Sequence, residues 1–215
     1  MKKILVILAM FLFAAGIAMA ENQVLLIDDF EGAISGGPSG TVDFGAGNGS
    51  TLQVTAATEQ AHSGKRSLKA DFDAVSGGYM YIARGSGLDA KNAGWLIKPE
   101  DIKWKEYNAI SFWMYGTGSK ARVAFDIKDS GNEIWRFIAT DDFKGWKQVV
   151  CKFNEFFARS DWQPDTAEKN GVIDFPLKSY QLEPLPVAKG ALYFDEVTLT
   201  LVQQKQNGET GTQKP

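Results

Sequence analysis

Four side chains of different chemistry stand close together near residue 160. Arg159, Asp161, Trp162 and Gln163 supply a guanidinium, a carboxylate, an indole and a carboxamide within five positions. A pyranose ring has an apolar C–H face that stacks on an aromatic ring, and hydroxyls that need paired donors and acceptors. The segment therefore predicts a sugar-binding element. The alternatives are that Trp162 anchors a loop and that Arg159 and Asp161 form a surface ion pair of little energetic weight.

Two alternating segments carry the remaining candidates. In the first, Tyr79 and Tyr81 share one face of an expected strand, and apolar side chains take the other face. In the second, Arg122 and Asp126 lie opposite a run of inward apolar residues. We expect the two phenols to extend the aromatic platform and the two charged groups to add polar contacts. The alternative is that Tyr79 and Tyr81 make cross-strand contacts that stabilise a half-exposed sheet.

The periodicity of the chain predicts an all-β fold. Nearly every periodic segment repeats every two residues, which gives roughly nine strand candidates and no convincing long amphipathic helix. An antiparallel β-sandwich of the jelly-roll kind is the economical interpretation. Residues 109–115 are apolar on both faces apart from Ser111, which predicts a central strand covered on both sides. Residues 33–50 are rich in Gly and Ser and predict a long loop.

The two ends of the chain differ from its middle. A basic start at Lys2 and Lys3, an apolar run over 4–17 and the small-x-small sequence Ala18-Met19-Ala20 predict a signal peptide over residues 1–20. A membrane anchor is the alternative, but the run is shorter than the roughly 20 residues of a bilayer span. We therefore expect a β-domain over 21–202, a disordered polar tail over 203–215, no membrane insertion of the mature chain, and a periplasmic or secreted location.

Charge and rare residues exclude several classes of function. Loss of Lys2 and Lys3 takes the formal net charge from -3 to -5, which argues against nucleic acid as a partner. Cys151 is the only cysteine, so no intrachain disulfide forms, and its place in an alternating strand predicts burial. His62 is the only histidine, which excludes a centre with several histidine ligands and argues against a His-dependent catalytic triad.

The order of several short motifs resembles family 11 carbohydrate-binding modules and their jelly-roll relatives. The resemblance covers most of the mature chain and is carried by residues 26–32, 62–68, 110–116, 145–149 and 194–197. In that family the place of Arg159, Asp161 and Trp162 holds an Arg, an Asp and a Tyr that bind glucan. Tyr79 resembles a second sugar-binding tyrosine. A further family tyrosine would fall within 181–185, where this sequence has none, although Tyr180 lies just before.

The resemblance implies an exported, non-catalytic protein that holds a β-glucan-like polysaccharide on a concave aromatic face. It also implies a structural calcium, because the first and last strands of jelly-roll modules often meet around one. Asp29 and Glu31 near the mature start and Asp195 in the last strand are the expected ligands. The alternative for these three residues is that they are solvated acidic strand ends.

Two other classes of function stay open at this stage. A glycosidase would need paired carboxylates, and Asp126 with Asp161 is one conceivable pair. The chain has no recognisable nucleophile motif, phosphate loop or metal-ligand spacing, so we do not expect an enzyme. The second alternative is a structural or interaction protein of the cell envelope or flagellar filament sheath, with an envelope protein as its partner, because proteins of those kinds share the fold type.

Overall fold

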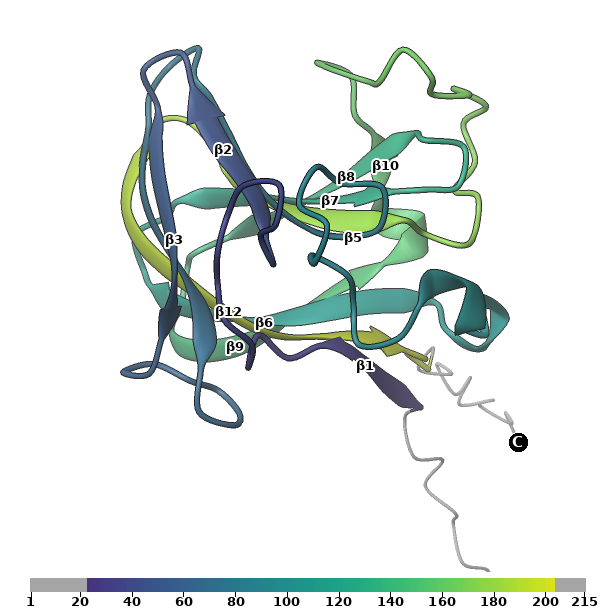
Figure 1. The fold of residues 1–215 in the computed structure, drawn as a ribbon, viewed down its shortest axis with the longest axis horizontal. Coiled ribbons are helices and arrows are strands. Elements are labelled where there is room, and N and C mark those ends of the chain that lie inside the picture. Colours follow the sequence, from purple (N-terminus) through teal and green to yellow (C-terminus); the bar gives the residue numbers. More distant parts are fainter. Residues whose placement is uncertain (1–22, 204–215) are drawn as a thin grey trace, which may run out of the picture.

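Two antiparallel sheets pack face to face in a computed structural model that describes residues 23–203 (Figure 1). The first sheet contains, in order, β3 (Thr51–Ala57), β4 (Ser67–Ala74), β12 (Ala188–Thr200), β6 (Ala109–Thr117) and β9 (Lys144–Lys152), with β1 (Val24–Asp28) also paired to β12. The second contains β10 (Phe157–Ala158), β8 (Ile134–Thr140), β7 (Arg122–Lys128), β11 (Ser179–Pro184), β5 (Tyr79–Gly85) and β2 (Asp43–Gly47). The predicted all-β sandwich is confirmed.

Helical structure within the described residues is limited to three short 3-10 turns: η1 (Pro99–Asp101), η2 (Trp104–Glu106) and η3 (Phe153–Glu155). None of the helices in this part of the chain has the length and apolar character needed to cross a bilayer. The predicted signal peptide lies outside the described residues, and so does the predicted tail apart from Gln203.

The core lies between the sheets, where the inward side chains of both meet. Phe112 of β6 stacks on Phe125 of β7 across the two layers, with ring centroids 4.7 Å apart. Phe194 of β12 packs against Phe112 at 6.1 Å, and Cys151 is fully buried beside them, as expected. This period-two burial fixes which side chains of each strand point away from the core.

A buried polar contact also joins the two sheets. The carboxylate of Asp28 in β1 accepts hydrogen bonds from the Arg84 guanidinium of β5 at 2.7 and 2.8 Å, and from the Tyr180 hydroxyl of β11 at 2.7 Å. Asp28 is fully buried, so its charge is stabilised by these donors. Tyr180 therefore faces the core and cannot stand in for the family tyrosine of the cleft.

One expectation about the scaffold was wrong and a second held only in part. The predicted loop over 33–50 contains strand β2, whose sequence Asp-Phe-Gly-Ala-Gly has little intrinsic β preference but pairs fully with β5. Strand β6 was expected to be covered on both sides. Its outer face is covered only over the first half, where Ala109 and Ser111 are buried, and Trp113 and Tyr115 stay partly exposed on the outer face of the first sheet.

Candidate ligand-binding face

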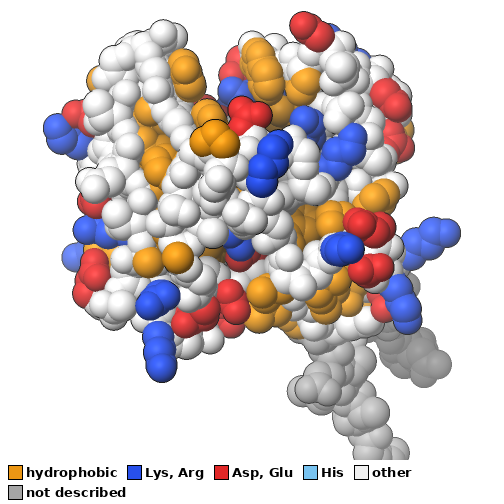
Figure 2. Space-filling model, in the orientation of Figure 1, with side chains coloured by type: hydrophobic (Ala, Val, Ile, Leu, Met, Phe, Trp, Pro, Cys, Tyr) orange, Lys and Arg blue, Asp and Glu red, His pale blue; other side chains and the backbone are white. Residues whose placement is uncertain are grey.

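The outward face of the second sheet gathers most of the predicted site residues. Directly opposed residues form a row across all six strands of this sheet: Asp43, Ala83, Gln181, Asp126, Arg136 and Phe157. Five strand spacings make this row about 24 Å long. The space-filling view shows the molecule hollowed between the β2–β3 hairpin and the segment after β10, with hydrophobic side chains on both sides (Figure 2).

A cluster of five charged groups occupies the β10 side of this face. Arg136 donates to Asp126 through two parallel bonds of 2.8 Å and also contacts Glu183. Arg159 donates to both oxygens of Asp161, at 3.0 and 2.9 Å, and lies 3.2 Å from Asp126 and 3.3 Å from Glu183. Both arginines thus share Asp126 and Glu183, and the cluster carries three carboxylates against two guanidinium groups.

Exposure and pKa separate the members of this cluster. The Asp126 and Glu183 side chains are nearly buried, whereas 59% of the Asp161 side chain is exposed. Burial raises the pKa of Glu183, despite the two neighbouring arginines. The hydrogen bonds from Arg159 lower the pKa of Asp161. Asp161 is therefore the ionised acceptor that a ligand can reach, and it lacks the raised pKa that a general acid of a glycosidase pair needs.

Gln163 fixes the segment that carries these groups. Its carboxamide oxygen accepts the backbone N–H of Ile134 at 2.8 Å, and its nitrogen donates to the carbonyls of Ile134 at 2.8 Å and Arg159 at 2.9 Å. The backbone N–H of Arg159 also donates to Ile134, at 2.9 Å. The Gln163 amide is therefore used within the protein, and we assign it a positioning role in place of the ligand contact predicted from the sequence.

Trp162 lies at the tip of the segment that Gln163 holds. Its side chain is 55% exposed, and the Arg159 guanidinium carbon lies 5.8 Å from its ring centroid. The exposure does not fit a buried loop anchor. Phe157, which is 50% exposed and pairs with Arg136, adds a second aromatic group at this end of the face.

At the other end of the face, two tyrosines of β5 lie over two glycines of the neighbouring strand β2. Tyr79 pairs with Gly47 and Tyr81 with Gly45 across β5 and β2. A β-carbon at Gly47 would meet the Tyr79 ring at 2.5 Å, and one at Gly45 would meet the Tyr81 ring at 3.1 Å. The rings therefore lie over the neighbouring strand, because glycine leaves room for them there.

Arg122 is placed less centrally than predicted. It is exposed at the start of β7 and pairs with Thr140, four residues along the strand from Asp126. At about 3.4 Å per residue this is roughly 14 Å from Asp126 along the strand. No ion pair of Arg122 occurs within residues 23–203. It shares the face with Tyr79 and Asp126 but does not join the cluster.

Sequence reasoning missed three residues of this face: Arg136, Glu183 and Phe157. Arg136 interrupts an apolar strand as a lone charge, and Glu183 does the same between Leu182 and Pro184. A single charge at an outward position of an otherwise apolar strand was the available signal. Nothing in the sequence around Phe157 distinguishes it from a core residue, because strand β10 is only two residues long.

The predicted calcium ligands do not form a cluster in the structure. Glu31 accepts the backbone N–H groups of Lys65 and Arg66 at 2.8 and 2.9 Å, and Asp195 accepts those of His62 and Ser63 at 2.8 and 3.2 Å. Over residues 23–203 no group of three or more Asp, Glu, His or Cys side chains could hold a metal.

Asp29 is also engaged, since it accepts the backbone N–H of Glu31 at 3.0 Å. Among the described residues Asp29, Glu31 and Asp195 therefore do not gather into one ligand set, and Glu31 and Asp195 instead hold the loop 62–66. The structural calcium stays a prediction, which the melting temperature with calcium and with a chelator would test.

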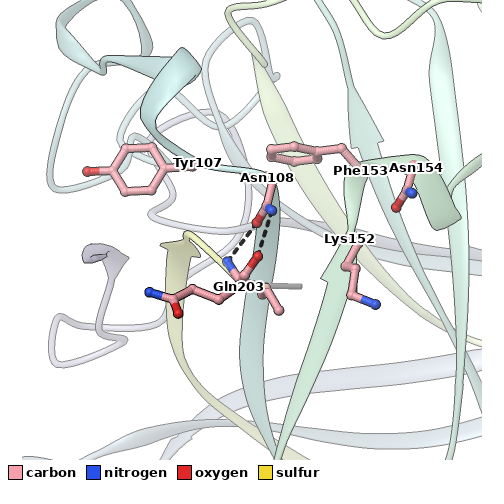
Figure 3. Close-up of a pocket in the computed structure, with 7 residues that line it drawn as sticks. Tyr107, Asn108, Lys152, Phe153, Asn154 and Gln203 are labelled. Atoms are coloured by element: carbon pink, nitrogen blue, oxygen red, sulfur yellow. Dashed lines mark hydrogen bonds between the residues drawn. The ribbon is translucent and has the colours of Figure 1, made fainter. Parts of the chain in front are cut away.

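A separate hollow of about 790 Å³ lies where β6 and β9 meet the end of the described chain (Figure 3). Asn108 closes one side, because its amide exchanges two hydrogen bonds with the backbone of Val202 at 2.9 and 2.7 Å. Lys152, Phe153 and Gln203 also line it. None of the sequence-predicted site residues contributes to this hollow.

The sequence profile of the carbohydrate binding domain of family 11 matches residues 17–201, which is most of the chain. The chain belongs to this family. The family is one of non-catalytic binding domains, and the predicted resemblance is confirmed. No curated protein sequence matches the chain.

Solved family 11 structures share the fold. The family 11 module from Clostridium thermocellum in complex with a β-1,3-1,4-mixed-linked tetrasaccharide is 19% identical, with a TM-score of 0.62 over 84% of this chain and 97% of that one. The family 11 module of a cellulosomal cellulase from the same organism is 17% identical, with a TM-score of 0.63 over 87% and 99%. A β-1,2-glucanase from Parabacteroides distasonis is 14% identical, with a TM-score of 0.51 over 85% of this chain and 25% of its own.

Proposed function

We propose that this family 11 module binds a β-glucan-like polysaccharide across the outward face of its second sheet. The observation that carries the proposal is that aromatic groups bound the charged middle of this face, Asp126 and Arg136, on both sides. Tyr79 and Tyr81 lie at the β5 end, and Phe157 and Trp162 at the β10 end. The tetrasaccharide bound by the family 11 module of Clostridium thermocellum supports a mixed-linkage β-glucan as ligand.

The chemistry of the face suits such a chain. The tyrosine rings and Trp162 offer flat apolar surfaces to the C–H faces of sugar rings. Asp161 and Gln181 offer hydrogen-bonding groups that are already oriented, since Arg159 holds Asp161 and Gln181 donates to Glu183 at 3.4 Å. A guanidinium and carboxylate cluster whose geometry is fixed before binding loses little conformational entropy when the ligand arrives. Each site should still be weak, because water competes for exposed hydrogen bonds.

The proposal includes an exported, periplasmic or secreted protein without catalytic activity of its own. The signal-peptide sequence over residues 1–20 supports export. The non-catalytic nature of the family supports the absence of activity. The lowered pKa of Asp161 supports a role for this residue as an ionised hydrogen-bond acceptor and not as a general acid.

The test is affinity electrophoresis of the mature protein in gels that contain mixed-linkage β-glucan, xyloglucan or mannan, followed by calorimetric titration with the mixed-linkage tetrasaccharide. We expect retardation in the β-glucan gel and a saturable heat of binding. The Asp161→Ala variant should migrate freely, whereas Asp165→Ala, an exposed acidic residue of the same segment, should be retarded like the wild type. Free migration of the wild type in every gel would overturn the proposal and favour the alternative of a structural or interaction protein of the cell envelope or filament sheath.

A further inference from the structure

The outer face of the first sheet carries a second row of aromatic groups. Lys69, Tyr193, Tyr115 and Trp146 are directly opposed across β4, β12, β6 and β9, and Thr55 of β3 continues the row. Four strand spacings make it about 19 Å long. The row lies on the side of the sandwich away from the face described above, and like the first row it crosses the strands.

The rings in this row contact one another and remain partly exposed. Tyr115 packs edge-on against Trp146 at 5.5 Å and against Tyr193 at 5.9 Å between ring centroids. Beside them, His62 stacks on Trp113 with centroids 3.6 Å apart and lies 5.7 Å from Trp146. All five rings are half-buried: the loop that carries His62 covers Trp113, whereas Tyr115, Trp146 and Tyr193 stay partly exposed. The sequence of β6 has the apolar character of a strand covered on both sides, so this face has the composition of a contact surface.

Charged groups of both signs border the row. Lys69 lies 5.7 Å from the Tyr193 ring centroid, 3.3 Å from Asp71 and 3.9 Å from Glu59. The Tyr193 hydroxyl donates to Glu59 at 3.4 Å. Next to Asp71 the face is hollowed over about 550 Å³ between β3, β4 and β12, where Gln53, Asp73 and Lys189 also line it. The hollow adds hydroxyl-binding groups at one end of the row.

We propose that this row is a second binding site for an uncharged polysaccharide, so that one module contacts two glycan segments on opposite sides. The charges beside the row are mixed, with two lysines and three carboxylates, which favours a neutral, hydroxyl-rich ligand over a polyanion or a nucleic acid. A protein–protein interface core is depleted of charged residues, whereas Lys69, Asp71 and Glu59 stand directly beside these rings. The first face has the same composition, since its aromatic rings also stand beside paired acidic and basic side chains.

The experiment uses the mature protein labelled with 5-fluorotryptophan, because its tryptophans report separately by fluorine NMR. Trp146 and Trp113 report on the second row and Trp162 on the first face, each assigned by its Trp→Phe variant. The probes are the mixed-linkage tetrasaccharide, mannohexaose and a xylo-oligosaccharide. They are raised to about 10 mM, where even a millimolar Kd would be near saturation. We expect at least one probe to shift the Trp146 signal saturably.

Variants separate the two sites. In an Asp161→Ala/Trp162→Ala protein the Trp146 shift should persist with an unchanged Kd. In Tyr193→Ala the Kd measured from the Trp146 shift should rise about tenfold, or the shift should vanish, while the Trp162 shift persists. Val150→Ala, on the same face of β9 but outside the row, is the matched control and should leave both unchanged.

Each outcome decides between the sites. A Trp162 shift without a Trp146 or Trp113 shift would overturn the second site and leave the first. A Trp146 shift without a Trp162 shift would support the second site and count against the first. A Trp146 signal that moves with protein concentration and not with sugar would show a second copy of the chain on this face, which also overturns the proposal.

Discussion

The ring of Tyr79 lies over Gly47, so closely that a β-carbon at residue 47 would stand 2.5 Å from the Tyr79 Cε1 atom. The two residues pair across the edge of the second sheet. Tyr79 is 51% exposed and could swing away from a larger neighbour, so the glycine determines how the ring lies more than whether the sheet forms.

Gly47→Ala should therefore weaken glucan binding without unfolding the protein. The displaced ring would lose most of its stacking on the sugar, which is worth about 0.5–1.5 kcal/mol, or roughly a two- to tenfold rise in Kd. Calorimetric titration with the mixed-linkage tetrasaccharide measures the change. Gly94→Ala is the control, since a β-carbon there meets nothing within 4 Å. An unchanged Kd in Gly47→Ala would show that the position of the Tyr79 ring does not matter.

Trp162→Ala should separate binding from stability. The side chain is 55% exposed, so the free energy of unfolding should change by less than about 0.5 kcal/mol. The Kd for the tetrasaccharide should rise about tenfold through lost stacking. Val172→Ala, at a position that is 59% exposed in the same long segment, should change neither quantity. Retained affinity in a folded Trp162→Ala protein would remove this residue from the site.

Arg136→Met should destabilise the fold. The substitution leaves Asp126 and Glu183 nearly buried, with Arg159 as their remaining cation, and breaking a buried pair in this way costs about 3–5 kcal/mol. Urea denaturation measures the loss. Arg122→Met, which removes an exposed arginine from the neighbouring strand, should cost less than about 0.5 kcal/mol. Equal losses in the two variants would mean that the cluster contributes little to stability.

Gln163→Ala should loosen the segment that carries Asp161 and Trp162. It removes the side-chain partners of the Ile134 N–H and carbonyl, which should cost about 1–3 kcal/mol where the groups are left unpaired. Hydrogen exchange at the Ile134 amide should become faster, and the Kd for the tetrasaccharide should rise. Gln148→Ala, an exposed glutamine of the other sheet, is the control. Slow exchange at Ile134 in the variant would count against the positioning role.

Asp195 should make stability depend on pH between about 4 and 6. Burial raises the pKa of this carboxyl to about 6, well above the usual range of an aspartate, although three backbone N–H groups oppose the change and Glu196 adds to it. The folded state then binds more protons than the unfolded state in this window, so this residue's contribution to stability is lost as pH rises.

The Asp195→Asn variant lacks this titration. The stability of the wild type relative to Asp195→Asn should fall between pH 4 and pH 6 and stay level from pH 7 to pH 8, as measured by urea denaturation at each pH. Asp165→Asn, an exposed residue of the segment after β10, controls for the general loss of a charge. A constant difference between wild type and Asp195→Asn across this range would contradict the raised pKa.

The sequence by itself determined the fold class, the family and much of the first face. Period-two alternation placed Tyr79 with Tyr81 and Arg122 with Asp126 on shared faces, because successive side chains of a strand point to opposite sides. The spacing of Arg159, Asp161 and Trp162 is local, so one short segment holds all three whatever the rest of the chain does.

Only the tertiary structure decided which strands became neighbours. Arg136 meets Asp126 and Glu183 because β8, β7 and β11 are adjacent, and that order follows from long-range pairing that no local pattern encodes. The same pairing aligned Tyr193, Tyr115 and Trp146 into one row from three separate strands. It also set Tyr180 into the core and Gln163 against the backbone of Ile134. Residue types and period state what a side chain can do and which way it points, whereas register and strand order decide what it meets.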